Sequence, residues 1–280
     1  MKKHNNWRFS GRTTVVLLGM ILVIAGCVTN PLTGKRTMAF IHNNQLLPMA
    51  YAEYDEFLKE NTVISGTAEA QMVERVGERL AIAAQKWLES EGNPHYLDDY
   101  RWEYKLVQDD QINAWCMPGG KIVVYTGILP VTKTEEGLAV VLGHELSHAL
   151  LNHGQQNMSA GILQELGMFA IQLGAQAAGL SDTAQEALVL TAYLGSIIGG
   201  TLPFSRNNES EADHYGLLLM AIAGYNPDEA VPFWQRMSAI GGGGTPQFLS
   251  THPSHSTRIQ QLQGWNAEAK RKAAEFGVRF

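Results

Sequence analysis

The stretch His144-Glu145-Leu146-Ser147-His148 decides how this 280-residue sequence is interpreted. Residues four apart lie on one face of a helix, so both imidazoles can reach one metal ion, and Glu145 projects beside them. The flanking residues 138–151 are apolar at helical spacing, which predicts a buried helix. Two imidazoles and a carboxylate in an apolar interior are costly without a partner. The pentapeptide therefore favours a metal site over a helix with two hydrogen-bonded core histidines.

A third metal ligand is expected downstream, because a catalytic zinc site takes three protein ligands and keeps one open position. The segment 205–213 is rich in carboxylates at the start of a predicted helix. Glu209 is the candidate ligand. Asp213, four residues later, would share its face and could accept a hydrogen bond from a ligand histidine. The alternative is that these acids only complement the helix dipole.

Four separated patterns together resemble one known family. They are Asn113 to Gly120 with the strand after it, His144 to His148, Ser205 to Asp213, and Thr251 to Ile259. The sequence is similar to the zinc metallopeptidases that include the membrane protease HtpX, the CAAX prenyl proteases, mitochondrial Oma-type proteases and the bacterial envelope proteins BepA and LoiP.

The resemblance implies an α+β, mainly helical gluzincin domain in which a small β-sheet packs against the active-site helix. It also implies peptide hydrolysis with one Zn²⁺, ligands His144, His148 and Glu209, and Glu145 as the catalytic carboxylate. The chain lacks convincing transmembrane helices, so it looks closer to the soluble Oma-like and envelope-lipoprotein branch than to HtpX or the prenyl proteases.

Periodicity predicts the main elements around this site. An amphipathic helix is expected over 67–91 and two strands over 101–107 and 121–126. Thr132 and Glu135 have capping-box spacing and are expected to open the metal-binding helix. Two apolar segments, 159–178 and 183–199, are interrupted by Gln and Glu, which favours core helices; a membrane-touching hairpin is the alternative.

Two further groups of residues are candidates for contact with a substrate. The strand that follows Gly119 and Gly120, with Ile122 and Val124, could offer an edge to an extended peptide; the alternative is plain sheet core. His252 follows the flexible stretch 241–244 and could occupy the open zinc position or gate the cleft; the alternative is a turn histidine. Tyr225 and Arg206 are candidate oxyanion donors.

The N-terminus has the layout of an export signal. Four basic residues precede an apolar run too short to cross a bilayer, and small residues lead directly to Cys27. This resembles a lipobox, which implies cleavage before Cys27 and acylation of its thiol; an ordinary signal or an uncleaved anchor are the alternatives. We expect a signal peptide over 1–26, a tether over 27–44 and the metallopeptidase domain over 45–280.

Charge and cysteine content narrow the function. Removal of residues 1–26 lowers the net charge from −6 to −10, which disfavours a nucleic-acid partner. Cys116 would be the other cysteine, so a disulfide framework is excluded if Cys27 is lipidated.

We expect an endopeptidase of misfolded or stalled envelope proteins, held by a lipid anchor facing the periplasm, in the outer membrane rather than the inner. The alternative is a metal-stabilised envelope chaperone or assembly factor.

Overall fold

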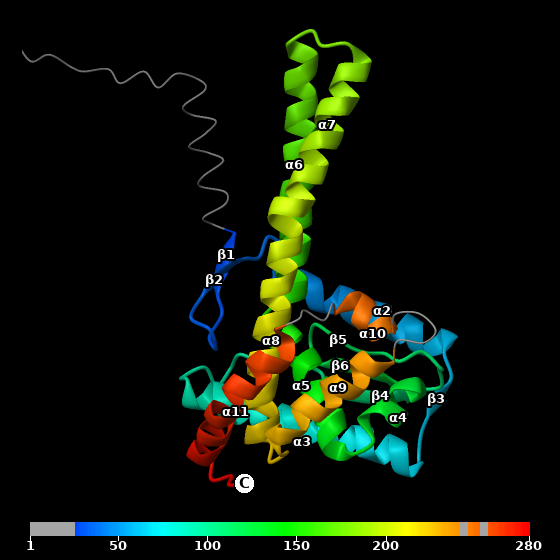
Figure 1. Cartoon of the computed structure of the whole chain (residues 1–280), viewed down its shortest axis with the longest axis vertical. Helices are drawn as coiled ribbons and strands as arrows, with labels where there is room; N and C mark the ends of the chain where they lie inside the picture. Colours follow the sequence, from blue (N-terminus) through cyan, green and yellow to red (C-terminus); the bar gives the residue numbers. More distant parts are fainter. Residues whose placement is uncertain (1–25, 241–245, 253–256) are drawn as a thin grey trace, which may run out of the picture.

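The computed structural model describes residues 26–240, 246–252 and 257–280. The basic and apolar parts of the predicted signal peptide and the glycine stretch 241–244 lie outside these residues. The described chain is mainly helical with a small sheet, as predicted (Figure 1).

The sheet has four strands in the order β3-β4-β6-β5. Strands β4 and β6 are parallel, whereas β3 and β5 pair antiparallel with their neighbours. Alternate residues of β6 face opposite sides, as the pleat requires. Ile122 and Val124 belong to the main core, and Val123 packs with Tyr54 on the other face. The four strands are β3 Val63–Ile64, β4 Glu103–Val107, β5 Ala114–Met117 and β6 Lys121–Tyr125.

Helices cover both faces of this sheet. Helix α2 (Asn43–Glu60) lies against one face, and α3 (Ala68–Ser90) and α5 (Glu135–Leu150) pack with the main core on the other. Helix α8 (Leu202–Ile222) packs on α5. The two helices approach closely because glycines face each other: a Cβ on Gly216 would lie 2.8 Å from the backbone of Gly143. This close packing brings the metal-binding helix next to the acidic segment.

The remaining elements complete the framework. They are β1 Cys27–Thr29, β2 Arg36–Met38, η1 Thr126–Ile128, α4 Leu129–Thr132, α6 His153–Ala177, α7 Asp182–Ser196, the π-helical turn η2 Ile197–Thr201, η3 Pro227–Glu229, α9 Ala230–Ala239, α10 Gln247–Thr251 and α11 Arg258–Glu275.

The helix cap predicted before the metal-binding helix is displaced by two residues. Thr134 is the N-cap of α5, and its side chain accepts a hydrogen bond from the Gly137 N–H. Thr132 instead ends α4 and donates its hydroxyl to the Leu129 carbonyl. The prediction of Thr132 was wrong because the separate one-turn helix α4 could not be distinguished from the start of α5 by spacing alone.

Part of the segment predicted as a tether carries local structure. Strands β1 and β2 form an antiparallel hairpin in which Cys27 pairs with Met38. Asn30, which lies in the turn of this hairpin, is buried and donates a hydrogen bond from its amide to the Leu150 carbonyl at 2.7 Å. Further on, the Phe40 N–H donates to the Ser159 hydroxyl of α6. These contacts are made by polar groups, which leave no hydrophobic periodicity in the sequence. The pattern of residues 27–44 therefore did not predict them.

The expectation that segments 159–178 and 183–199 are core helices was wrong. Helices α6 and α7 form a long hairpin that projects from the rest of the molecule (Figure 1), and no residue of α7 is buried. Helix α7 continues through η2 into α8, and this continuous helix Asp182–Ile222 is long and apolar enough to cross a membrane. The polar residues that suggested a soluble core partly pair within the hairpin: the Gln164 amide donates to the Ser196 hydroxyl.

Candidate metal centre

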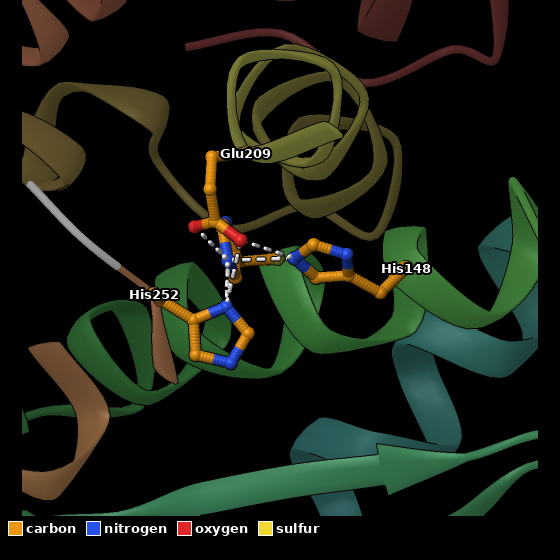
Figure 2. A group of neighbouring side chains, drawn as sticks. His148, Glu209 and His252 are labelled. Carbon is orange, nitrogen blue, oxygen red and sulfur yellow. Dashed lines mark hydrogen bonds and ion pairs between the residues drawn. The ribbon is translucent and has the colours of Figure 1, made fainter. Parts of the chain in front are cut away.

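Three helices bring four candidate ligands to one point. Helix α5 supplies His144 and His148, α8 supplies Glu209, and His252 directly follows α10. Figure 2 shows His148, Glu209 and His252 pointing toward one another. One ligand atom from each of the four lies within 4.8 Å of all the others. The sequence placed His144, His148 and Glu209 together and named His252 as a candidate for the open zinc position, and the structure brings all four into one cluster.

The geometry of this cluster fits a cation. The Nε2 atom of His144 lies 3.1 Å from Nε2 of His148 and 3.2 Å from Nδ1 of His252. The Glu209 carboxylate lies 3.0–3.4 Å from the same three rings. Neutral imidazoles point lone pairs at one another in such an arrangement, and a shared positive charge relieves that repulsion. Two imidazoles and one carboxylate form a three-ligand set that zinc takes in catalytic sites, and His252 lies at the remaining position.

Glu145 lies beside the four ligands without being one of them. Its Oε1 atom is buried and has no hydrogen-bond partner among the described residues, and His252 Nε2 lies 3.4 Å from it. Burial is the main cause that raises the pKa of Glu145. A buried carboxylate oxygen with unused acceptor capacity, next to a cation site, is suited to hold and deprotonate a water molecule.

Asp213 and Arg258 support the ligands from behind. Asp213 accepts a hydrogen bond from His144 Nδ1 at 2.9 Å, which leaves Nε2 of that ring for the ion. Burial opposes the charge on Asp213, but Arg258 and His144 outweigh it and lower the pKa of Asp213. Arg258 is 1% exposed, binds Asp213 at 2.6 Å and Glu209 at 2.9 Å, and stacks on Trp234.

The two ligand histidines have opposite proton affinities in the metal-free site. Burial disfavours charge on His144, but the hydrogen bonds to Asp213 and Glu209 prevail and raise its pKa to about 10. Burial dominates at His148 and lowers its pKa to about 3. Burial also opposes the charge on Glu209, but its histidine partners lower the pKa of this carboxylate overall. The site is therefore ready to bind a cation through one already neutral imidazole and one carboxylate.

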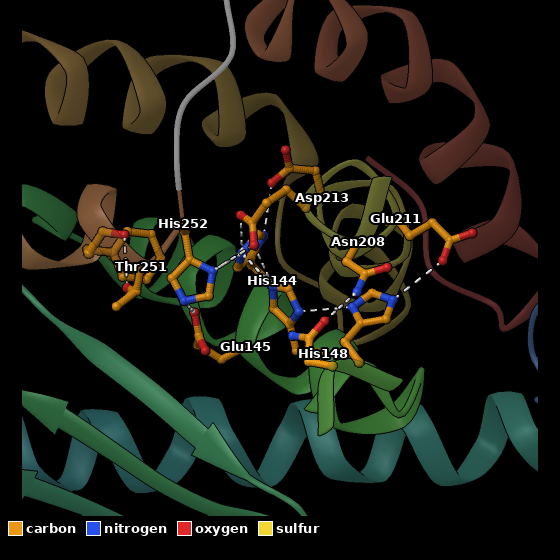
Figure 3. A network of polar contacts seen from close by, with 12 residues as sticks. His144, Glu145, His148, Asn208, Glu211, Asp213, Thr251 and His252 are labelled. Carbon is orange, nitrogen blue, oxygen red and sulfur yellow. Dashed lines mark hydrogen bonds and ion pairs between the residues drawn. The ribbon is translucent and has the colours of Figure 1, made fainter. Parts of the chain in front are cut away.

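A second polar chain runs from His148 to the protein surface (Figure 3). His153 Nδ1 lies 2.9 Å from His148 Nδ1, and His153 Nε2 lies 3.4 Å from Glu211, which pairs with Lys35. Thus both ligand histidines have a polar partner at the ring nitrogen remote from the ion. The chain turns at Asn152, with φ of +59°, and this turn directs the His153 ring back to His148.

The metal centre opens into a cavity of about 290 Å³. Glu145, His148, Glu209 and His252 line it together with Cys116 and Pro118 at the end of β5. Burial is the main cause that raises the pKa of the Cys116 thiol, so this cysteine is kept neutral. The cavity therefore joins the metal site to one edge of the sheet.

The strand expected to offer an edge to substrate is not an edge strand. Strand β6, with Ile122 and Val124, pairs on one side with β4 and on the other with β5, so its backbone groups are used within the sheet. Strand β5 is one of the two terminal strands, and its residue Cys116 lines the cavity. Gly119 and Gly120 form the connecting turn, both with positive φ. The prediction failed because strand order is a tertiary property that residue composition does not encode.

Two other candidate residues have different surroundings from those expected. The Tyr225 hydroxyl contacts Glu135 at the N-terminus of α5, and Arg79 lies over its ring, which places it away from the four ligands. Arg206 does not line the cavity. Arg258 was missed as a functional residue, although it stands in the segment Thr251 to Ile259 that carried the family resemblance.

Comparison with known proteins identifies the relatives of this chain. The model of "Peptidase family M48" matches residues 67–266. The chain is 30% identical to metalloprotease YcaL of Escherichia coli over 209 residues, which is 74% of this chain and 76% of YcaL. It is 38% identical to mitochondrial metalloendopeptidase OMA1 of Schizosaccharomyces pombe over 178 residues, 63% of this chain and 50% of that protein.

A third relative is the beta-barrel assembly-enhancing protease of Yersinia pestis, 29% identical over 174 residues, 58% of this chain and 34% of that protein. The chain spans half or less of the OMA1 proteins of fission yeast, Arabidopsis thaliana and Saccharomyces cerevisiae.

Proposed function

Because the chain belongs to peptidase family M48, we propose that it is a zinc-dependent metalloendopeptidase of the bacterial envelope. The observation that carries this proposal is the convergence of His144, His148 and Glu209 around one point, with the buried carboxylate of Glu145 beside them. A purely structural zinc site has four closed ligands and needs no such base.

The roles of the protein's residues follow from this geometry. When bound, zinc lowers the pKa of a water molecule and polarises the scissile carbonyl. Glu145 accepts the proton of that water and passes it to the leaving amine. Asp213 and His153 hold the ligand imidazoles in orientation. His252 lies against Glu145 and Glu209 on the cavity side, so it must withdraw when a substrate carbonyl approaches.

We place the substrate along β5 rather than β6. An extended peptide that adds to the terminal strand of a sheet is recognised through its backbone, which suits an enzyme that cleaves unfolded chains of varied sequence. Support comes from the position of Cys116 and Pro118 in the cavity wall. Unfolded or misfolded envelope proteins are the substrate class that we propose.

We further propose attachment to the envelope through lipidated Cys27, facing the periplasm, with the outer membrane favoured over the inner. The proposal rests on the lipobox-like sequence before Cys27. It would place this chain in the envelope-lipoprotein branch of the family rather than in the HtpX or prenyl protease branch.

The decisive experiment compares Glu145→Gln with the parent chain in detergent on casein and on an unfolded outer-membrane protein. We expect cleavage to fall by about 10²–10⁴-fold, because the general base is lost, while bound zinc measured by mass spectrometry is unchanged. Glu136→Gln, on the same helix but outside the cavity, is the matched control and should keep full activity. Equal cleavage by Glu145→Gln and the parent would refute the assigned base, and no cleavage by the parent would favour the chaperone alternative.

A further inference from the structure

The hairpin formed by residues 158–204 exposes an unusual amount of apolar side chain. Figure 1 shows α6 and α7 extending together from the body of the molecule. Large apolar residues along both helices and the start of α8 are more than one-third exposed: Met158, Leu166, Phe169, Leu173, Leu180, Leu188, Leu190, Tyr193, Leu194, Ile198 and Leu202. An apolar surface this continuous is rare on a soluble monomer and indicates contact with another apolar phase.

Few residues of the hairpin are charged, and all of them are acidic. It contains no lysine, arginine or histidine, and its three charged residues are Glu165, Asp182 and Glu186. Asp182 begins α7 at the tip, and Glu186 is one turn from it. Residues 187–204 are therefore uncharged, a length of about 27 Å at 1.5 Å per residue, close to the roughly 30 Å of bilayer hydrocarbon.

Several polar side chains of the hairpin pair with one another or with their own helix. The Gln164 amide donates to Ser196 across the hairpin at 2.7 Å. The Thr191 hydroxyl donates to the Ala187 carbonyl and the Ser196 hydroxyl to the Tyr193 carbonyl, both at 2.7 Å. Such internal pairing is required where no water is available. It is not required of helices that remain in water.

From these features we infer that the hairpin inserts into the hydrocarbon of a lipid bilayer. A protein partner would bury one outer face of α7, but α7 has no buried residue, and only the stripe that faces α6 is half-buried. The base of the hairpin also lies on the same side as Cys27, because β2, which pairs with the Cys27 strand, contacts α6. The membrane contact is thus distinct from the proposed anchor and independent of peptidase activity.

The experiment places an environment-sensitive fluorophore on a single cysteine in the full-length chain. Leu190→Cys and, as a matched control, Ile82→Cys are labelled in a background of Cys27→Ser and Cys116→Ala. Both positions are exposed apolar residues, 58% and 50% respectively, and Ile82 lies on α3 in the body. The proteins are reconstituted with phosphatidylcholine vesicles with and without brominated acyl chains.

We expect a blue shift and at least twofold quenching by brominated lipid at Leu190, and neither at Ile82. The N-terminal apolar segment cannot produce this difference, since both chains carry it. Binding should not require anionic lipid, because the hairpin has no basic residues. No quenching at Leu190 would overturn the proposal. A concentration-dependent blue shift without vesicles would overturn it as well, since it would indicate that a second copy covers this surface.

Discussion

At the residue scale, the charge of the metal centre depends on Arg258. This buried guanidinium pairs with both Asp213 and Glu209, and removing it takes a permanent positive charge away from two carboxylates in a low-dielectric interior. Because such uncompensated charge is expensive, we expect Arg258→Ala to lower the free energy of unfolding by about 3–5 kcal/mol. Urea denaturation of the metal-free protein measures this.

The matched control is Arg75→Ala, because Arg75 pairs with Glu135 at a largely exposed position. An exposed ion pair contributes at most about 1 kcal/mol. If both substitutions have the same small effect, Arg258 does not neutralise the buried acids.

Asp213 supports the metal through His144 and should affect affinity more than stability. In Asp213→Asn, the amide can no longer hold the Nδ1 proton of His144 as a charged acceptor does, so we expect zinc affinity to fall about 10–100-fold. Competition with a chromophoric chelator gives the dissociation constant. Asp228→Asn, which removes an exposed pair with Lys270, should leave zinc affinity unchanged. An unaltered affinity in Asp213→Asn would contradict the supporting role.

Spacing alone was sufficient to find part of this site. His144, Glu145 and His148 follow from one helical turn, and the four-residue step from Glu209 to Asp213 placed both on one face. Arg258 could not be assigned in this way, because its partner Asp213 lies 45 residues away. His153 contacts His148, five residues earlier, but the turn at Asn152 interrupts the helical spacing between them, and its other partner Glu211 lies 58 residues away. Long-range polar pairs leave no periodic signal in a sequence.

At the element scale, the site depends on how closely α5 and α8 approach. A Cβ added to Gly216 would lie 2.8 Å from the His144 backbone nitrogen, and backbone atoms cannot move aside as a side-chain end can. We expect Gly216→Ala to separate the two helices, lower the free energy of unfolding by about 1–3 kcal/mol and weaken zinc binding. Urea denaturation and the chelator competition measure the two effects.

Gly264→Ala on α11 is the control for this change, because nothing lies within 4 Å of its added Cβ. There we expect a gain of about 0.5–1 kcal/mol from helix propensity. Weakening at both positions would show that the effect is unrelated to helix contact.

Helices and strands could be predicted where the hydrophobic periodicity of the segment itself indicated them. The amphipathic helix expected over 67–91 is α3, Ala68–Ser90, and the two expected strands are β4 and β6. The position of β6 inside the sheet and the exposure of α7 were not predictable, since both depend on which neighbours are present. An apolar helix has the same composition whether it packs in a protein core or lies in lipid.

At the scale of the whole molecule, the candidate metal centre lies where several elements of the fold meet. Helix α5 packs with the sheet, α8 packs on α5, and α10 contributes His252, so a bound ion links elements far apart in the sequence. The hairpin is also directly connected to the metal centre. Leu202, at the base of the hairpin, and Glu209 lie on the same helix, about 10 Å apart along its axis. Insertion of the hairpin would therefore hold the metal centre close to the membrane surface.

Removal of the ion should weaken this link. Zinc at about 100 times its dissociation constant stabilises the folded state by roughly 2.7 kcal/mol. For a domain of this size that corresponds to a decrease in Tm of about 5–10 °C on chelation. Calorimetry with and without a chelator at pH 8 measures the difference, and His144→Ala, which lacks a ligand, should show none. Equal Tm values for the parent in both conditions would mean that the ion does not join the helices.

The effect of zinc should also depend on pH in a defined direction. The pKa of His144 is raised to about 10 in the metal-free fold, above its ordinary value of 6.5, because Asp213 and Glu209 outweigh the cost of burial. Proton binding therefore stabilises the metal-free fold fully below about pH 6.5, and this contribution is lost as the pH rises through 10. Zinc must displace that proton from His144. The chelator-induced decrease in Tm should consequently shrink from pH 8 to pH 6, and a larger decrease at pH 6 would contradict this competition.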